Sequence, residues 1–377
     1  MDFDLTEEQQ LLRNSARDFL TAKCPKEVVK ELEAGETGHS PELWRMMADL
    51  GWMGLPVPEE YGGAGFNFLD LAVLFEEVGR AAMPGPLFNT VVTGALPILE
   101  FGAEEQKRNF LPEISSGDRI VTMAISEPNV NYDARYIATT ATRQPDGFSI
   151  SGTKLFVPYP HVADFILVAA RTGGKRGDDK GITVFIIDAK SPGLTMTQLK
   201  NIASDKLYEV VFDDVSVSAD AILGELDDGM TVLESTLLKA RAIQCAMMVG
   251  GAQQELEITA EYTRTRVQFG QPIGAFQAVQ HRAADMLIDT SGARLITYQA
   301  VWRLNEGLPA EKEVALAKSF TDMASQRVAL GAQQLHAGIG FDTDYDLHFY
   351  YRRQKAFDLR LGTTEHNLKR LEKEYGL

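Results

Sequence analysis

The segment Ala124-Ile125-Ser126-Glu127-Pro128 lies where the pattern of the chain changes. Before it, up to about residue 118, apolar residues recur at helical spacing, and Thr6-Glu7-Glu8-Gln9 has the pattern of a capping box. From about Arg119 the chain consists of short β-rich runs separated by polar or glycine-bearing turns, namely Ile120–Ile125, Phe148–Val157, Phe165–Ala170, Ile182–Ile187 and Val210–Val217. The segment therefore marks the passage from a helical domain into a β domain.

Helical periodicity returns from about Met230 and continues to the end of the chain. It is interrupted at three turns, Phe269-Gly270-Gln271-Pro272, Gly307-Leu308-Pro309 and Gly338-Ile339-Gly340, which predicts four long helices in an antiparallel bundle. No helix-length segment separates the β runs, so a parallel βαβ sheet is not expected. The expected fold is α+β, with an N-terminal helical domain (1–118), a small β-barrel-like domain (119–228) and a four-helix bundle (229–377).

Composition narrows the classes of function. The chain has 377 residues, 45% of them hydrophobic, which is enough for a large core, and its net charge of -16 disfavours nucleic-acid binding. We expect a soluble cytoplasmic protein, because no apolar run approaches the ~18 residues that span a membrane and the start lacks the features of a secretory signal. The two cysteines, Cys24 and Cys245, lack CxxC spacing, and the six histidines form no ligand pair, so no metal site is expected.

Motifs of common nucleotide, phosphate and hydrolase sites are missing from the sequence. Instead, seven stretches taken in chain order resemble the acyl-CoA dehydrogenases, and the resemblance covers nearly the whole chain. They are Ala124–Pro128, Gly152–Phe156 with Ala163-Asp164, Arg241, Arg266–Ile273, Gln277, Gln334–Gly340 and Gly362-Thr363-Thr364-Glu365. The resemblance implies that family's fold, and FAD as the cofactor.

The resemblance also assigns roles around the flavin. Backbone groups of Ile125 and Ser126 are expected to bond its pyrimidine side, and Met123 and Phe156 to cover its faces. A second set is expected to reach the FAD of a neighbouring subunit, which implies an oligomer such as a tetramer: Arg266, Phe269, Gln277, Gln334 and Gly338. Thr363 and Glu365 are expected to approach the cofactor from the other side. Each residue alone also has a structural interpretation: Arg266 as a solvated charge, Phe269 as core, Gln277 as surface, and Thr363 with Glu365 as a helix start.

The implied reaction is α,β-dehydrogenation of an acyl-CoA thioester to the 2-enoyl-CoA, with electrons passed to electron-transfer flavoprotein. A base removes the α proton while donors, among them the backbone N–H of the base residue, hold the thioester oxygen. Ungapped alignment to the family places Leu361 at the base position, and a second subgroup's base position is occupied by Ala240. Leucine cannot accept a proton, but its N–H survives. We therefore expect the backbone N–H of Leu361 to polarise the thioester, although the carboxylate that usually accepts the α proton is missing.

Other positions also depart from the family. Pro158 replaces a threonine expected near flavin N5, Asn131-Tyr132 replaces a Gly-Ser pair, and Arg360 stands where tyrosine is common. The resemblance places Arg241, Asn89 and Arg360 on the substrate side. Arg360 has two interpretations: contact with a substrate carboxylate or enolate, or a salt bridge to a nearby acid such as Asp358 or Glu365.

Three interpretations of the missing base stay open. The first is an active dehydrogenase with a base from elsewhere, although Pro86–Pro97 contains no acid and its polar members are Asn89, Thr90 and Thr93. The second is a subunit of a heteromeric dehydrogenase whose partner carries the base. Lys154–Asp164 and Gln333–Arg353 look closest to such branches, which act on steroid side chains or dicarboxylyl-CoA. The third is a non-enzymatic acyl-CoA or flavin binder.

Overall fold

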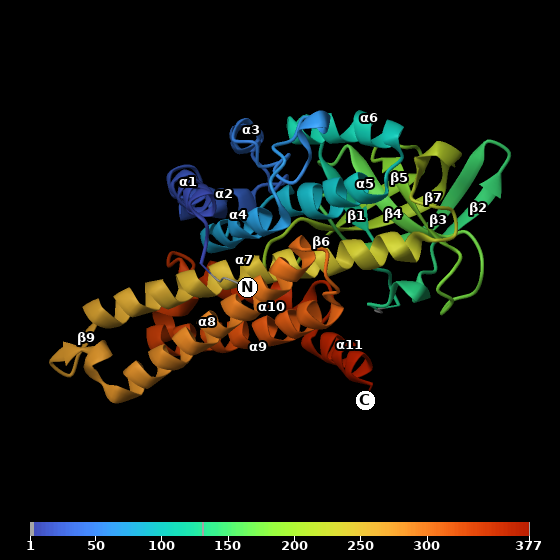
Figure 1. Ribbon diagram of the computed structural model, residues 1–377. Helices are drawn as coiled ribbons and strands as arrows, with labels where there is room; N and C mark the ends of the chain where they lie inside the picture. The colour runs from blue at the N-terminus through green and yellow to red at the C-terminus, as the bar shows by residue number, and fades with distance from the viewer. Residues whose placement is uncertain (1–3, 130–131, 377) are drawn as a thin grey trace. The chain divides into compact units, whose positions relative to one another are not determined.

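The computed structural model describes residues 4–129 and 132–376 (Figure 1), so Asn131 lies outside the described residues. The chain forms two compact units. One, here called the bundle unit, combines the chain up to Lys30, Asn67–Met83 and the chain from Arg241 onward; the other, the sheet unit, combines Glu31–Phe66 and Pro84–Ala240. No helix in the two described stretches has the length and apolarity needed to cross a bilayer.

The sheet unit is built on one eight-stranded sheet with the order β6-β7-β3-β2-β4-β5-β8, in which β1 pairs with β4. Its strands are β1 (Val121–Ala124), β2 (Thr140–Gln144), β3 (Gly147–Pro158), β4 (Phe165–Arg171), β5 (Ile182–Asp188), β6 (Leu194–Leu199), β7 (Leu207–Ser218) and β8 (Ile222–Leu223). Pairing is antiparallel except for β1 with β4 and β2 with β4. The five β-rich runs of the sequence are confirmed as strands, and β2, β6 and the two-residue β8 are additions.

Short helices accompany the sheet: α3 (Pro41–Asp49), α5 (Leu96–Phe101), α6 (Glu104–Ser115) and a π-helical turn, η2 (Asn89–Ala95). Apolar side chains from α5, α6 and one face of the sheet share a core, for example Ile98, Ile114 and Leu167. A second core covers the other face and includes Ile150, Phe185 and Val210. The sheet is thus buried on both faces, which holds the end of β1 in a fixed place.

The bundle unit contains the long helices expected from the sequence. They are α7 (Gly229–Thr265, entering this unit at Arg241), α8 (Gln277–Asn305), α9 (Glu311–His336) and α10 (Leu347–Leu359), followed by a shorter α11 (Thr364–Tyr375). Figure 1 shows α8 and α9 side by side, and a small hairpin of β9 (Val267–Gln268) and β10 (Gln271–Pro272) joins α7 to α8. The predicted bundle is confirmed, with α11 as a fifth helix.

Two N-terminal helices belong to the bundle unit and not to the sheet: α1 (Glu7–Lys23) and α4 (Phe68–Ala81), while α2 (Lys26–Ala34) spans the boundary. Thr6 caps α1 with the capping box expected from the sequence. The α4 side chain Glu76 is buried, and it accepts hydrogen bonds from Arg294 (2.6 Å) and the Tyr298 hydroxyl (2.8 Å) of α8. Because an unpaired buried carboxylate is costly, this network ties α4 to the bundle.

Candidate functional site

The end of β1 runs beside β3 in the sheet unit. Leu155 N–H donates to the Ser126 carbonyl (2.8 Å), and the Lys154 ammonium donates to the Ile125 carbonyl (3.2 Å). The Thr122 hydroxyl donates to the Pro158 carbonyl (2.6 Å). The structure therefore brings together Ile125 and Ser126 with the part of β3 that carries Phe156, as the sequence motifs require.

A fully buried ion pair fixes this segment. Lys154 Nζ lies 2.8 Å from Glu127 Oε1, and both side chains are almost completely removed from solvent. Glu127 also accepts from the backbone N–H groups of Ala138 (2.6 Å) and Thr139 (2.9 Å). Burial lowers the pKa of Lys154 to about 8 against the opposing effect of Glu127. Burial opposes the ionisation of Glu127, but Lys154 and the backbone donors outweigh it and lower its pKa, so the pair is ionic at neutral pH.

Two residues assigned to the flavin faces differ in exposure. Phe156 is 56% exposed and has a left-handed backbone (φ 56°), whereas Met123 is buried in the core shared with α5 and α6. An exposed aromatic ring held on a strained residue is a feature of binding sites. The role of Met123 toward a flavin stays a prediction.

Asn89 and Thr93 lie on the π-helical turn η2, which packs against β1. The Thr93 hydroxyl donates to the Asn89 carbonyl (3.0 Å), and the Thr90 hydroxyl accepts from Val121 N–H (3.4 Å). A Cβ on Gly94 would lie 2.9 Å from the Val121 side chain, so glycine permits this close approach. π-helical turns are often found at functional sites, and this one places Asn89 in the same unit as the Ile125 segment.

The bundle unit holds the loop with the substituted base position. Leu361 is half-buried and adopts a left-handed backbone (φ 62°), and Gly362 follows with φ 103°. The Leu361 carbonyl accepts a hydrogen bond from Arg241 Nε (2.7 Å), whose side chain is buried in α7. The Arg241 side chain thus binds the loop, and its contact with substrate stays a prediction. Ala240, the other base position, is also buried.

Acidic groups near this loop are engaged with lysines. Asp358 Oδ2 lies 2.7 Å from Lys355 Nζ, and Glu365 Oε1 lies 2.7 Å from Lys369 Nζ. The Arg360 guanidinium lies over the ring of Phe357, 5.6 Å from its centroid. Each of the two acids considered as partners of Arg360 thus pairs with a lysine.

A buried polar cluster behind the loop was missed by sequence reasoning. The Phe357 carbonyl, near the end of α10, accepts from Gln244 Nε2 (2.6 Å) and from Lys318 Nζ (3.1 Å). Lys318 also contacts both carboxylate oxygens of Asp322, at 2.5 and 2.7 Å, and all three side chains are buried. The sequence signal was a Lys and an Asp spaced i, i+4 in a part of α9 that has no other charged residue from Ala315 to Gln326.

The residues expected to reach a neighbouring subunit's cofactor are exposed: Arg266, Phe269, Gln277, Gln334 and Gly338. Phe269 is 92% exposed at the tip of the β9–β10 hairpin. Since α8 and α9 run antiparallel and Gly331 faces Met286, the end of α9 lies beside the start of α8. This groups the five residues at one end of the bundle.

Thr363 and Glu365 belong to a different place in the bundle unit. Thr363 caps α11, its hydroxyl accepting from His366 N–H (3.3 Å), and α11 follows the loop anchored at Lys318. Sixteen residues of α9 separate Lys318 from Gln334, which is about 24 Å of helix. One chain therefore presents two separate groups, as expected if each cofactor contacts two subunits.

These residues fit a flavin. The sheet unit offers an exposed aromatic ring, Phe156, beside an anchored backbone segment, and the bundle end offers exposed Arg266 and Phe269, a cation and an aromatic ring. Cationic and aromatic groups suit pyrophosphate and ring systems respectively. Packing of a single chain does not account for their exposure.

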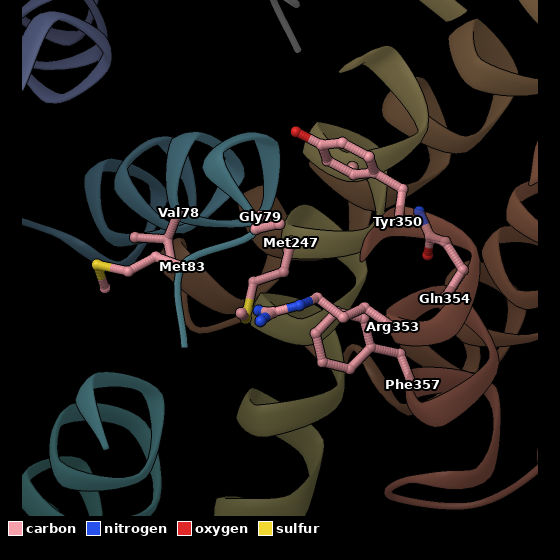
Figure 2. Close-up of a pocket in the computed structure, with 10 residues that line it drawn as sticks. Val78, Gly79, Met83, Met247, Tyr350, Arg353, Gln354 and Phe357 are labelled. Atoms are coloured by element: carbon pink, nitrogen blue, oxygen red, sulfur yellow. The ribbon is translucent and has the colours of Figure 1, made fainter. Parts of the chain in front are cut away.

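A small pocket in the bundle unit extends from Phe357 between α4, α7 and α10 (Figure 2). Its α4 side is apolar, with Val78 and Met83, and α10 contributes the polar side chains. The Tyr350 hydroxyl donates to the Arg80 carbonyl (2.8 Å) and Gln354 Nε2 to the Met248 carbonyl (3.0 Å). These two hydrogen bonds tie α10, the helix that leads into the Leu361 loop, to α4 and α7.

We expect Lys154→Met to lower the free energy of unfolding by about 3–5 kcal/mol, because Glu127 would stay buried without its cation. The midpoint of urea unfolding measures this. Lys154→Met/Glu127→Gln should recover part of the loss, since a neutral amide keeps only some of the acceptor sites. Lys190→Met, at an exposed position of the same unit, is the control. Unfolding of Lys154→Met at the wild-type urea concentration would contradict the proposed role of the pair.

Comparison with known proteins identifies the same family in three consecutive segments that cover most of the chain. Family models match residues 6–118 (acyl-CoA dehydrogenase, N-terminal domain), 122–215 (middle domain) and 227–375 (C-terminal domain). A probable acyl-CoA dehydrogenase, YngJ of Bacillus subtilis, is 34% identical over 97% of both chains. The ChsE4-ChsE5 complex of Mycobacterium tuberculosis is similar in structure (TM-score 0.92, 32% identity, 100% and 99% covered), as is the FAD complex of PigA (TM-score 0.94, 26% identity, 100% of both).

Proposed function

Because the chain belongs to the acyl-CoA dehydrogenase family, we propose that it dehydrogenates an acyl-CoA thioester to the 2-enoyl-CoA with a non-standard or partner-supplied base. The family is one of oxidoreductases, and FAD is the cofactor. Bound FAD supplies the acceptor for the β hydrogen and its electron pair. We infer that the electrons then pass to electron-transfer flavoprotein.

The observation that carries this proposal is the loop at Leu361. Its N–H is presented by a left-handed backbone, and its carbonyl is held by the buried Arg241. A backbone donor fixed in this way stabilises negative charge on a thioester oxygen as the α proton leaves. The leucine side chain cannot take that proton. The chain therefore retains the donor of the reaction and lacks the usual acceptor.

Assembly with other subunits is supported by the surface of the bundle. Apolar side chains are exposed on α8 and α9, among them Ile288 and Leu295, and Leu316, Met323 and Leu330, each set at seven-residue spacing. Stripes with this spacing pack against other helices. We propose that this stripe is covered in an oligomer, either a homotetramer or a heteromer with a related subunit. The similar ChsE4-ChsE5 structure is a complex of two different chains.

The test is anaerobic titration of the FAD-reconstituted protein with a panel of acyl-CoA thioesters, alone and mixed with a family member that carries the base. We expect bleaching of the flavin absorbance with the mixture and little or none with the chain alone. Bleaching by the chain alone at the same rate would show a base within it. Binding of thioesters without bleaching in either sample would identify a non-enzymatic binder, and failure to bind FAD would overturn the proposal.

A further inference from the structure

The carbonyl of Phe357 is a convergence point in the bundle unit. It accepts hydrogen bonds from Gln244 Nε2 of α7 (2.6 Å), Lys318 Nζ of α9 (3.1 Å) and the backbone N–H of Arg360 (3.1 Å). The last bond is the one that ends α10. Two side chains from separate helices thus hold the point at which α10 gives way to the Leu361 loop.

Lys318, the charged donor to the Phe357 carbonyl, is buried at a cost in desolvation free energy. Lys318 and Asp322 are completely buried and pair within one helix. The free-energy cost of removing two charges from water often exceeds the gain from their attraction. A buried pair is therefore weak evidence for a role in stability. Burial raises the pKa of Asp322 to about 7 against the opposing effect of Lys318. Asp322 is itself unsuited to be the missing base, because both of its oxygens contact Lys318.

The loop is anchored on both sides of the donor. On the N-terminal side of the Leu361 N–H, the Phe357 carbonyl is held by Lys318 and Gln244. On the C-terminal side, the Leu361 carbonyl is held by Arg241. Charge-assisted bonds are about twice as strong as neutral ones, and two of these three anchors are cations. The short segment between the anchors therefore has little freedom to turn the Leu361 N–H.

We propose that Lys318 and Gln244 are positioning residues, which hold the Phe357 carbonyl so that the Leu361 N–H points at the thioester oxygen of a bound acyl-CoA. This inference rests on the proposed function, and it extends that function to residues that do not touch the substrate. It gives the costly buried pair a role behind a loop without an acid, because the Leu361 N–H needs support whether or not the side chain is a base.

The test measures polarisation of the thioester without turnover. An aryl-conjugated 2-enoyl-CoA absorbs at longer wavelength when donors polarise its carbonyl, so the red shift on binding to the oxidised flavoprotein reports the donor's geometry. The variants are Gln244→Leu and Lys318→Met/Asp322→Leu. The double variant removes both charges and avoids leaving Asp322 buried alone. Lys312→Met, which removes a partly exposed lysine of the same helix whose ammonium lies over the Tyr375 ring, is the control.

We expect both variants to retain FAD and unfold at temperatures near that of wild type, to lose at least half of the red shift, and to bind the ester about 10-fold more weakly, a loss of about 1.4 kcal/mol. The control should match wild type. An unchanged red shift in both variants overturns the positioning role and leaves the proposed function intact. Wild-type protein that binds the ester without a red shift overturns it too, because the Leu361 N–H then does not polarise the thioester. Absence of FAD and ester binding in wild type is the distinct failure of the proposed function.

Discussion

Leu361→Glu is expected to give this chain dehydrogenase activity of its own. The backbone at this position is already anchored through the carbonyls of Phe357 and Leu361, and these anchors do not depend on the side chain. The left-handed conformation (φ 62°) strains leucine and glutamate alike. A correctly placed general base contributes about 10²- to 10⁴-fold to such a reaction. The rate of anaerobic flavin bleaching by acyl-CoA should increase by that factor.

The matched control is Leu361→Gln, because glutamine has nearly the size and shape of glutamate but carries no charge and accepts no proton at neutral pH. It should bleach the flavin no faster than wild type. Equal rates for the glutamate and glutamine variants, in samples with equal FAD content and equal thioester affinity, would show that the missing carboxylate is not what limits the chain. The base would then have to be sought elsewhere in the assembly.

The fold was largely predictable because its elements carry strong local signals. Strands such as β4 and β5 are nearly continuous apolar runs, buried on both faces. Three strands of this sheet were missed. β2 (Thr140–Gln144) is mostly exposed and polar, and β8 (Ile222–Leu223) has only two residues. β6 (Leu194–Leu199) alternates over only four residues and has no fully buried side chain. The π-helical form of η2 also leaves no local signature.

Tertiary contacts, which local sequence patterns do not predict, determine the placement of α4 and the anchoring of the Leu361 loop. The sequence places α4 with the other N-terminal helices, but the buried Glu76 joins it to α8 through Arg294 and Tyr298. Motif residues of the site, such as Ile125 and Ser126, are neighbours in sequence and were found together. Contacts between Lys318, Gln244 and the Phe357 carbonyl join three separate helices, and a single sequence does not reveal them.

Glu255 on α7 is another buried ionisable group that the sequence analysis did not predict. Its side chain is fully buried, and neither carboxylate oxygen has a hydrogen-bond partner in the described part of the chain. Burial raises its pKa well above the usual value of 4.5. The native state therefore holds a proton that the unfolded chain releases, and stability should fall as the pH rises from near the usual carboxyl pKa through the raised one.

Glu255→Gln should remove this dependence, because the amide has nearly the same shape and no proton to lose. Wild type should lose about 1.4 kcal/mol per pH unit through this group over that window, and the variant should not. Urea unfolding of both proteins at pH 5 and pH 8 measures the difference, which should be small at pH 5 and favour the variant at pH 8. Glu261→Gln, an exposed acid on the same helix, should retain the wild-type dependence. Parallel pH profiles for wild type and Glu255→Gln would mean that Glu255 is ionised in the folded chain, and its burial would then require a cation from a partner.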